Sequence, residues 1–258
     1  MTQQHVLGID IGGSGIKGAI VDLAAGDLVA DRFRIETPAE STPGNVAKVV
    51  AQIVDHFGDD LGDGPVGVTF PAVVQHGTTL SAANVDHSWI NAPAEKILAE
   101  ELGRPVVLVN DADAAGLAEV KYGAAKDAEG LVIVTTLGTG IGSAIVYNGV
   151  LIPNSELGHL EIDGYDAEKR AAASIKTKEG LSYDEYVPRL QRYYETVEFL
   201  FTPDLLVVGG GISKKAYKFL PKLKLRTPIV PATLQNRAGI IGAAALAVDK
   251  SAHPDLVR

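Results

Sequence analysis

The chain has 258 residues, no cysteine, a formal net charge of −9 and a hydrophobic content of 46%. This length and apolar content suffice for a sizeable core, and we expect two compact lobes. The missing cysteines exclude disulfides and thiolate metal sites, and the acidic balance argues against general nucleic-acid binding. No apolar run approaches the roughly 18 residues of a membrane-spanning helix, and no leader precedes the first strand. We therefore expect a cytoplasmic protein without a membrane or nucleic-acid partner.

The first distinctive segment is a glycine-rich turn between two β-rich runs. His5–Ile11 and Ile16–Leu23 flank Gly12-Gly13-Ser14-Gly15, with Asp10 before the turn and Lys17 after it. The pattern predicts a β-hairpin with a wide tip, where backbone N–H groups can converge on a phosphate because no Cβ blocks its approach. A dinucleotide-binding loop is excluded because a strand follows the glycines, and no Walker motif occurs. A tight hairpin with purely structural glycines is the alternative.

A second copy of this segment lies in the other half of the chain. The apolar strand predicted from Leu131 leads into Thr136–Val146, and Gly140–Val146 is identical to Gly15–Val21 at five of seven positions. Two phosphate-type hairpins, one in each half, indicate a duplicated domain whose ligand is held between the copies.

The first half is predicted to have the element order β-β-β-α-β. Asp27–Glu36 is the expected third strand, Thr42 and Pro43 begin a helix that continues to Phe57, and Pro65–Phe70 is the next strand. This order is typical of a ribonuclease-H-like lobe.

An irregular segment, Thr69–Trp89, follows at the carboxyl end of that strand, where open α/β sheets bind ligands. We interpret Trp89 as a packing anchor. Asn84 is a candidate hydroxyl contact in this segment, with an ordinary turn residue as the alternative.

A run of polar side chains follows the next buried strand. After a helix from Pro93 to Gly103, strand Arg104–Val109 leads directly into Asn110-Asp111-Ala112-Asp113 and a helix from Ala114. Packing explains three polar side chains at a strand end poorly, although one of them can cap the helix. We assign the cap to Asp113, which leaves Asn110 and Asp111 for chemistry.

The second half repeats the strand pattern and then becomes basic. The expected elements are strands Leu131–Leu137, Gly142–Tyr147 and Val150–Pro153, helices Ala167–Ile175 and Ser182–Phe201, strands Leu205–Val208 and Thr227–Pro231, and a closing helix Ala238–Val248. Gly209-Gly210-Gly211 opens a lysine-rich helix. From residue 205 to residue 248 there is no acid but seven lysines and arginines, which suggests an anionic ligand. A solvated lysine-rich helix and loop is the alternative.

Four motifs together resemble the ROK sugar kinases of the actin and hexokinase superfamily. They are Asp10-Ile-Gly-Gly-Ser, Asn110-Asp111-Ala-Asp-Ala-Ala, Leu137-Gly-Thr-Gly-Ile-Gly and Glu156-Leu-Gly-His159, in the family's order and spacing. The resemblance covers nearly the whole chain, and several details are similar to the polyphosphate-dependent glucokinase branch. It implies an α/β fold of two ribonuclease-H-like lobes with a cleft between them, residues 1–110 joined by 238–258 and residues 111–237, and a homodimer.

The resemblance also implies roles for individual residues. Asp111 is the expected general base, which takes the proton of the attacking sugar hydroxyl. The expected sugar-binding residues are Asn84, Asn110, Asp111, Glu156, His159 and Glu168. The expected donor-binding residues are Gly12, Gly13, Ser14, Lys17, Gly138, Thr139, Gly140, Gly210, Gly211, Lys214 and Lys215. Asp10 is expected to orient a hydrated Mg²⁺ ion. A solvated Lys17 and a surface helix position for Glu168 are the alternatives.

In most ROK kinases the histidine that matches His159 binds zinc together with a cysteine cluster. This chain has no cysteine, so we expect no zinc, although Glu156 and His159 have the spacing of half a metal site.

The shortened, cysteine-free region and the basic tract favour inorganic polyphosphate as the donor, with Lys214, Lys215 and Lys218 along its path. The expected reaction is transfer to the 6-hydroxyl of glucose, giving glucose 6-phosphate. ATP as a further donor, a strictly ATP-dependent glucokinase and a kinase for another hexose such as mannose remain alternatives. A sugar-responsive repressor would need an N-terminal DNA-binding domain, for which the hairpin near residue 8 leaves no room. An actin-like polymer would not need Glu156, His159 and Asn110-Asp111 together.

Overall fold

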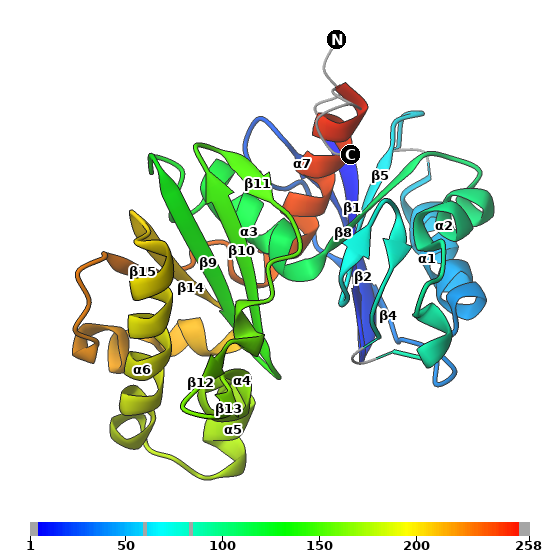
Figure 1. Cartoon of the computed structure of the whole chain (residues 1–258). Helices are drawn as coiled ribbons and strands as arrows, with labels where there is room; N and C mark the ends of the chain where they lie inside the picture. Colours follow the sequence, from blue (N-terminus) through cyan, green and yellow to red (C-terminus); the bar gives the residue numbers. More distant parts are fainter. Residues whose placement is uncertain (1–4, 59–60, 83–84, 253–258) are drawn as a thin grey trace. The chain divides into compact units, whose positions relative to one another are not determined.

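The computed structural model describes residues 5–58, 61–82 and 85–252, which form two compact units. The first unit consists of Met1–Ala118 and Arg237–Arg258, and the second of Glu119–Asn236. Each unit contains one main sheet with helices against it (Figure 1). The division falls inside helix α3 (Asp111–Tyr122), which begins directly after Asn110.

The first unit is built on a six-stranded mixed sheet. Its strands are β1 (His5–Gly12), β2 (Gly15–Asp22), β3 (Asp27–Leu28), β4 (Phe33–Ile35), β5 (Val66–Phe70) and β8 (Val106–Asn110). The sheet order is β3-β2-β1-β5-β8, with β4 also paired to β2; β1 and β2 are antiparallel, whereas β1, β5 and β8 run parallel.

The prediction of a single strand at Asp27–Glu36 is wrong, because the structure has the two short strands β3 and β4 with a bend between them. Val29 donates its N–H to the carbonyl of Ile20, and the chain then leaves the ladder through the exposed residues Asp31 and Arg32. Two charged side chains side by side favour solvent over a paired strand, which explains the interruption.

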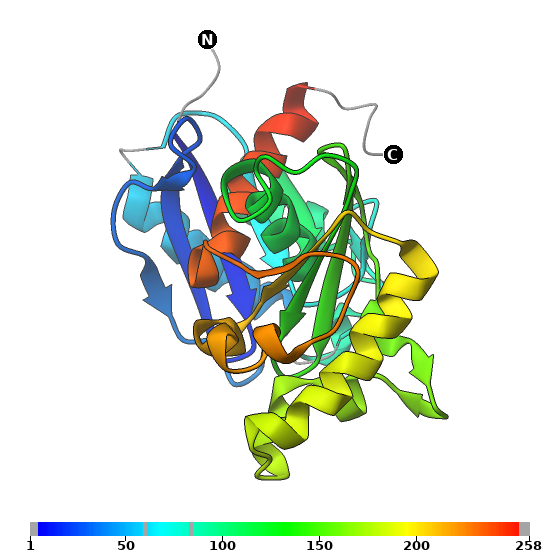
Figure 2. The ribbon, with the colours of Figure 1, turned by 90° about the vertical axis from the view of Figure 1, so that its left-hand side faces the viewer.

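Helices cover both faces of this sheet. On one face lie α1 (Pro43–Phe57) and α2 (Ala94–Leu102), whose apolar residues pack in a core with Ile9 and Val68. Thr42 precedes α1 in an extended conformation, although its side chain makes no capping hydrogen bond. Helix α7 (Ala238–Ala252) contacts β1, β5 and β8 (Figure 2).

Glycines bring α7 close to its neighbours. A Cβ on Gly8 would lie 2.1 Å from the carbonyl oxygen of Ile240, and one on Gly67 would lie 2.0 Å from that of Ala243. On α7 itself, a Cβ on Gly242 would lie 1.8 Å from the carbonyl oxygen of Ala114 in α3. Backbone atoms cannot yield as a side-chain end can, so these contacts require glycine.

The segment after β5 forms a small hairpin and a single turn of helix. β6 (Val74–Gln75) pairs with β7 (Thr78–Thr79), and the 3-10 turn His87–Trp89 follows. Trp89 is fully buried against Phe70 and donates its indole N–H to the carbonyl of Ser41, 2.7 Å away. The interpretation of Trp89 as a packing anchor is therefore confirmed. Asn84 lies outside the described residues.

The second unit repeats the strand connectivity of the first. Its strands are β9 (Leu131–Leu137), β10 (Ile141–Tyr147), β11 (Val150–Ile152), β14 (Leu205–Gly209) and β15 (Ile229–Pro231), in the order β11-β10-β9-β14-β15. As in the first unit, an antiparallel hairpin is followed by two parallel strands. Asn148 and Gly149, both with positive φ, form the predicted turn between β10 and β11. The structure thus confirms the duplication inferred from the two glycine motifs.

Helix α6 (Tyr183–Phe201) packs on one face of this sheet, where Tyr186, Leu190 and Tyr194 join the core. Ser182 caps α6 through a reciprocal pair of bonds with Glu185. The remaining elements are β12 (Glu161–Ile162), β13 (Tyr165–Asp166), α4 (Glu168–Ala171), α5 (Ala173–Lys178), and the 3-10 helices η3 (Leu157–His159), η4 (Gly211–Lys218), η5 (Leu220–Lys222) and η6 (Gln235–Arg237). No helix in the described parts of the chain is both long and apolar enough to cross a membrane.

Two expected helices differ in the structure. The helix predicted at Ala167–Ile175 is divided into α4 and α5 by Ala172, whose backbone is extended. The lysine-rich helix is not an α-helix: it is the 3-10 segment η4, which kinks at Lys215. Lys214 and Lys218 would repel each other one α-helical turn apart, and Pro221 prevents continuation, so both features disfavour a regular helix here.

Candidate active site

The hairpin formed by β1 and β2, here the first hairpin, has a tip of two residues, Gly13 and Ser14. Gly12 and Gly15 still pair across the ladder, so the turn is narrower than the sequence suggested. The carbonyl of Gly12 accepts a hydrogen bond from the Thr37 hydroxyl, and that of Ser14 accepts one from the Arg34 guanidinium at 2.7 Å. Within the described chain, no group accepts a hydrogen bond from the N–H of Gly13 or Ser14. These N–H groups are therefore free to donate to an anion.

Asp10 lies beside the first hairpin with both carboxylate oxygens engaged. Oδ1 accepts a hydrogen bond from the Thr69 hydroxyl at 2.9 Å, and Oδ2 lies 3.4 Å from Nζ of Lys17. Asp10 and Lys17 are directly paired in the ladder, so their side chains project from the same face of the sheet. Lys17 is thus an ion-pair partner of Asp10 and not a lone solvated lysine.

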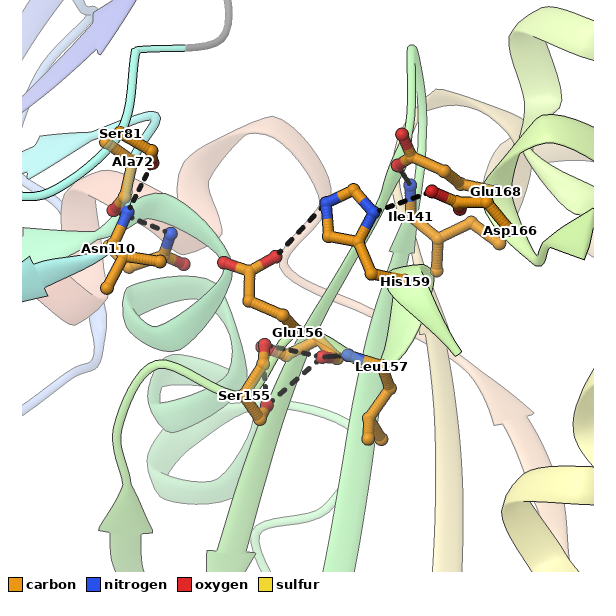
Figure 3. A network of polar contacts seen from close by, with 12 residues as sticks. Ala72, Ser81, Asn110, Ile141, Ser155, Glu156, Leu157, His159, Asp166 and Glu168 are labelled. Atoms are coloured by element: carbon orange, nitrogen blue, oxygen red, sulfur yellow. Dashed lines mark hydrogen bonds and ion pairs between the residues drawn. The ribbon is translucent and has the colours of Figure 1, made fainter. Parts of the chain in front are cut away.

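The Asn110-Asp111 segment joins β8 to α3. Oδ1 of Asn110 accepts hydrogen bonds from the N–H groups of Ala112 (2.8 Å) and Asp113 (3.1 Å), so Asn110 caps the helix. The assignment of the cap to Asp113 is wrong, because the helix begins at Asp111 and encloses Asp113, which is buried. Nδ2 of Asn110 donates to the carbonyl of Ala72 at 3.0 Å, which ties α3 to the segment after β5 (Figure 3).

Asp111 is the first residue of α3 and is exposed. Its Oδ1 accepts a hydrogen bond from the N–H of Ala112 at 2.8 Å. The parallel register aligns Asp10 with Thr69 and Phe70 with Asn110, so the carboxyl edge of one sheet carries both Asp10 and the Asn110-Asp111 pair. The aligned strands β1 and β8 are two strand spacings apart, about 10 Å.

The hairpin formed by β9 and β10, here the second hairpin, has the three-residue tip Gly138-Thr139-Gly140. The N–H of Gly138 donates to the carbonyl of Gly140 at 3.0 Å, which closes the tip. Ser174 holds it from outside: its N–H donates to the carbonyl of Gly138 at 3.0 Å and its hydroxyl to that of Thr139 at 2.6 Å. The break between α4 and α5 places Ser174 in the first turn of α5, where it makes these contacts.

Two further contacts fix the surroundings of the second hairpin. A Cβ on Gly140 would lie 2.2 Å from Oε2 of Glu168, and that same oxygen accepts a hydrogen bond from the N–H of Ile141 at 3.1 Å. Gly210, with φ +80°, lies so close that a Cβ would be 2.3 Å from the carbonyl oxygen of Leu137. Gly140 and Gly210 are therefore glycines for steric reasons in addition to any phosphate contact.

The loop that carries Glu156 is bonded to strand β10. The Ser143 hydroxyl donates to the carbonyl of Ser155 at 2.7 Å and accepts from the N–H of Leu157 at 2.9 Å. The Ser155 hydroxyl donates back to the carbonyl of Ser143 at 3.0 Å. Gly158 then packs on the backbone of Ile141, because a Cβ there would lie 2.2 Å from its carbonyl oxygen. These contacts set the position of the side chains on either side, Glu156 and His159.

His159 lies between two carboxylates, as Figure 3 shows. Its Nδ1 is 3.0 Å from Oδ2 of Asp166, and its Nε2 is 4.0 Å from Oε2 of Glu156. The hydrogen bond to Asp166 raises the pKa of His159 above its usual value, and the negative charge of Glu168 adds to this effect. Burial raises the pKa of Glu156, although His159 opposes the shift. The cluster therefore combines one imidazole with carboxylates that can bind neighbouring hydroxyl groups.

Glu168 belongs to this cluster and is not a solvated surface residue of its helix. Ligand atoms of His159, Asp166 and Glu168 all lie within 4.8 Å of one another, close enough to hold a metal ion. These three residues offer three ligands, whereas a closed zinc site uses four. Both carboxylates already have hydrogen-bond partners, Glu168 with the N–H of Ile141 and Asp166 with His159. The expectation that the chain binds no zinc stays a prediction.

The predicted residues fall into separate groups. In the first unit, Gly12, Gly13, Ser14, Lys17 and Asp10 lie together at the first hairpin, whereas Asn110 and Asp111 lie at the end of β8. In the second unit, Gly138, Thr139, Gly140, Glu156, His159 and Glu168 form one group. Gly210 contacts this group through Leu137, and Lys214 and Lys215 are exposed on η4.

The sequence reasoning missed four residues that hold these groups in place: Thr69, Arg34, Asp166 and Ser174. Asp166 had a usable signal, because Asp163-Gly164 is a hairpin turn and places Asp166 on its second strand. Ser174 and Arg34 had none, since their partners lie 35 and 20 positions away.

Comparisons with known proteins identify the family of this chain. A sequence model of the ROK family matches residues 6–174. The polyphosphate glucokinase of Mycobacterium tuberculosis (strain CDC 1551 / Oshkosh) is 53% identical over 253 residues, which cover 98% of this chain and 94% of that protein.

Two solved structures extend the comparison to the fold. The inorganic polyphosphate/ATP-glucomannokinase of Arthrobacter sp. strain KM has a TM-score of 0.90 at 56% identity, with 96% of this chain and 100% of that chain covered. A ROK family glucokinase from Streptomyces griseus, solved with glucose and AMPPNP, shares the fold with a TM-score of 0.80 at 22% identity over 95% and 99% of the two chains. Since the family match covers more than half of its length, this chain belongs to the ROK family.

Proposed function

We propose that the chain transfers a phosphoryl group from inorganic polyphosphate to the 6-hydroxyl of glucose, giving glucose 6-phosphate, and that ATP is a second donor. The observation that carries this proposal is the 53% identity, over 98% of the chain, to a polyphosphate glucokinase. The clustering of Glu156, His159 and Glu168 beside the second hairpin supports it, because a sugar kinase needs hydroxyl-binding groups close to a donor loop.

The two hairpins would hold the donor. Backbone N–H groups of Gly13 and Ser14 in the first hairpin, and of Thr139 in the second, would bind phosphate oxygens. Asp10 fits the indirect binding of Mg²⁺, because its partly exposed carboxylate is oriented by Thr69 and could accept hydrogen bonds from the ion's water ligands. The ion would neutralise charge on the transferring group, and Lys17 would add a positive charge beside it.

The acceptor would be held by polar side chains. Glu156, His159 and Glu168 would hydrogen-bond hydroxyls of the pyranose ring, with Asn84 and Asn110 as further contacts. Asp111 would accept the proton of the 6-hydroxyl as that oxygen attacks phosphorus. We also propose that the protein accepts mannose, in line with the name of the Arthrobacter enzyme. We further propose that it acts as a cytoplasmic homodimer.

The donor assignment predicts that the purified protein phosphorylates glucose with long-chain polyphosphate and, less efficiently, with ATP. Raising the salt concentration should weaken polyphosphate use more than ATP use, because a longer polyanion makes more screened charge contacts. The measurement is glucose 6-phosphate formation with each donor at low and high salt. Activity with ATP and none with polyphosphate would instead support the strictly ATP-dependent glucokinase.

The base assignment predicts that Asp111→Asn lowers kcat by about 10²- to 10⁴-fold, because the amide cannot accept the hydroxyl proton. Glucose affinity, measured by calorimetry, should change little. Asp127→Asn, which changes an exposed acid outside the site, is the matched control and should keep full turnover. Near-normal turnover of Asp111→Asn would show that another group is the base.

The His159 geometry predicts a pH effect. The pKa of His159 should lie above that of an ordinary histidine. Asp166→Asn should lower this pKa, because it weakens the hydrogen bond that favours the imidazolium. The attraction between protonated His159 and Asp166 stabilises the folded state fully at pH values below the unfolded-state pKa of His159. This contribution is lost as the pH rises through the raised folded-state pKa.

An NMR titration of the histidine ring protons measures this effect, with the His159 signal assigned from the variant His159→Gln. Asp163→Asn, on the same β12–β13 hairpin but paired with Arg192, is the control and should leave the titration unchanged. An unaltered His159 titration in Asp166→Asn would contradict the assigned cause.

A further inference from the structure

The cations of the second unit differ in whether a carboxylate lies beside them. Arg189, Arg192, Lys222 and Arg226 each have a carboxylate partner, respectively Glu179, Asp163, Asp184 and Glu198. By contrast, no carboxylate of the described chain lies within 4.0 Å of Nζ of Lys176, Lys214, Lys215 or Lys218. Cations without fixed counter-charges produce a positive potential that attracts a mobile anion.

Two elements that carry these lysines start at the second hairpin. In the first turn of helix α5, Ser174 donates hydrogen bonds to the carbonyls of Gly138 and Thr139. Segment η4 begins after Gly210, which packs on the backbone of Leu137. Each element therefore leads away from the hairpin that we propose as a donor site.

The two elements bring their lysines to one aromatic ring. Nζ of Lys176 on α5 lies 4.4 Å from the centroid of the Tyr183 ring, and Nζ of Lys218 on η4 lies 5.6 Å from the same centroid. Phe219 stacks on Tyr183 with centroids 5.8 Å apart and rings 3° from parallel. The Tyr183 ring, stacked on Phe219, is thus a common neighbour of the two ammonium groups.

Acidic residues near this place are already engaged. Asp184 pairs with Lys222, and Glu185 caps α6 with Ser182. Lys176 donates to the carbonyl of Leu181 at 2.6 Å, which holds its ammonium in position. The bonds to Ser182 lower the pKa of Glu185, and the charge of Lys176 adds a smaller effect, so this carboxylate offsets part of the lysine's charge without an ion pair. Two like charges held beside one ring are more stable when an anion bridges them.

We propose that a polyphosphate chain leaving the second hairpin runs between α5 and η4, and that Lys176 and Lys218 beside Tyr183 bind its phosphates beyond the transferring end. This inference rests on the proposed function and names a further donor subsite. Lys176 is two residues past Ser174, about 3 Å along the axis of α5, so its long side chain reaches phosphates beyond those held at the tip. A linear polyanion with no base to recognise needs only such a row of point charges.

The test compares donors of different length in the double variant Lys176→Gln/Lys218→Gln. For long-chain polyphosphate, kcat/KM should fall at least about tenfold, because charge-lined sites raise encounter rates by at least about that factor. The salt dependence of kcat/KM for this donor should also become weaker. For tripolyphosphate, kcat/KM should stay within about twofold, because so short a donor does not extend past the hairpin. Glucose affinity should be unchanged.

The matched control is Lys96→Gln, an exposed lysine on α2 of the first unit that pairs with Glu100. It should behave as the unchanged protein with every donor. The single variant Lys218→Gln changes an exposed position, where misfolding is not expected, and should show part of the effect.

Three results would overturn the proposal. One is an unchanged kcat/KM for long polyphosphate in the double variant, and another is an equal loss for long and short donors. A loss confined to ATP would assign the two lysines to a nucleotide. If the unchanged protein uses ATP but no polyphosphate of any length, the proposed function fails as well, and this outcome is distinct from the others.

Discussion

The carboxylate of Glu168 is the constraint on which the organisation of the second unit depends. It lies where a side chain on Gly140 would be and accepts a hydrogen bond from the N–H of Ile141, so it is fixed to the second hairpin. The same residue lies within 4.8 Å of the ligand atoms of His159 and Asp166. This hydrogen bond therefore links the glycine tip to the cluster of His159, Asp166 and Glu168. Precise positioning of such groups is what phosphoryl transfer requires of a protein.

The first unit achieves a comparable rigidity through close packing and a cap. Glycines in β1, β5 and α7 let α7 approach the sheet at backbone distance, and Asn110 bonds the start of α3 to the segment after β5. Both devices act at one sheet, whose carboxyl edge carries Asp10 and Asp111. In this unit Asp10 and Asn110 lie at the ends of buried strands, so core packing determines their positions.

The sequence predicted the parts of this protein that depend on local spacing. Both hairpins, the duplicated strand order and the Glu156 and His159 pair could be found because their residues are close in the chain. The helix cap was misassigned because Asn110, Asp111 and Asp113 all suit that position, and only the helix start distinguishes them. Arg34, Ser174 and Thr69 were missed because their partners lie 20, 35 and 59 positions away in the chain. The lysine-rich segment was predicted as a regular helix but is a kinked 3-10 segment, because the prediction did not consider the repulsion between Lys214 and Lys218.

The most direct test of the Glu168 constraint is the glucose affinity of Gly140→Ala, measured by calorimetry beside Gly138→Ala. A Cβ at residue 140 displaces only the end of the Glu168 side chain, so the fold should survive, whereas a Cβ at residue 138 meets nothing within 4 Å. Loss of a hydrogen bond to a charged group is worth about 2 kcal/mol, so Gly140→Ala should bind glucose at least about tenfold more weakly. Gly138→Ala should bind it normally. Equal and unchanged affinities in the two variants would contradict the account.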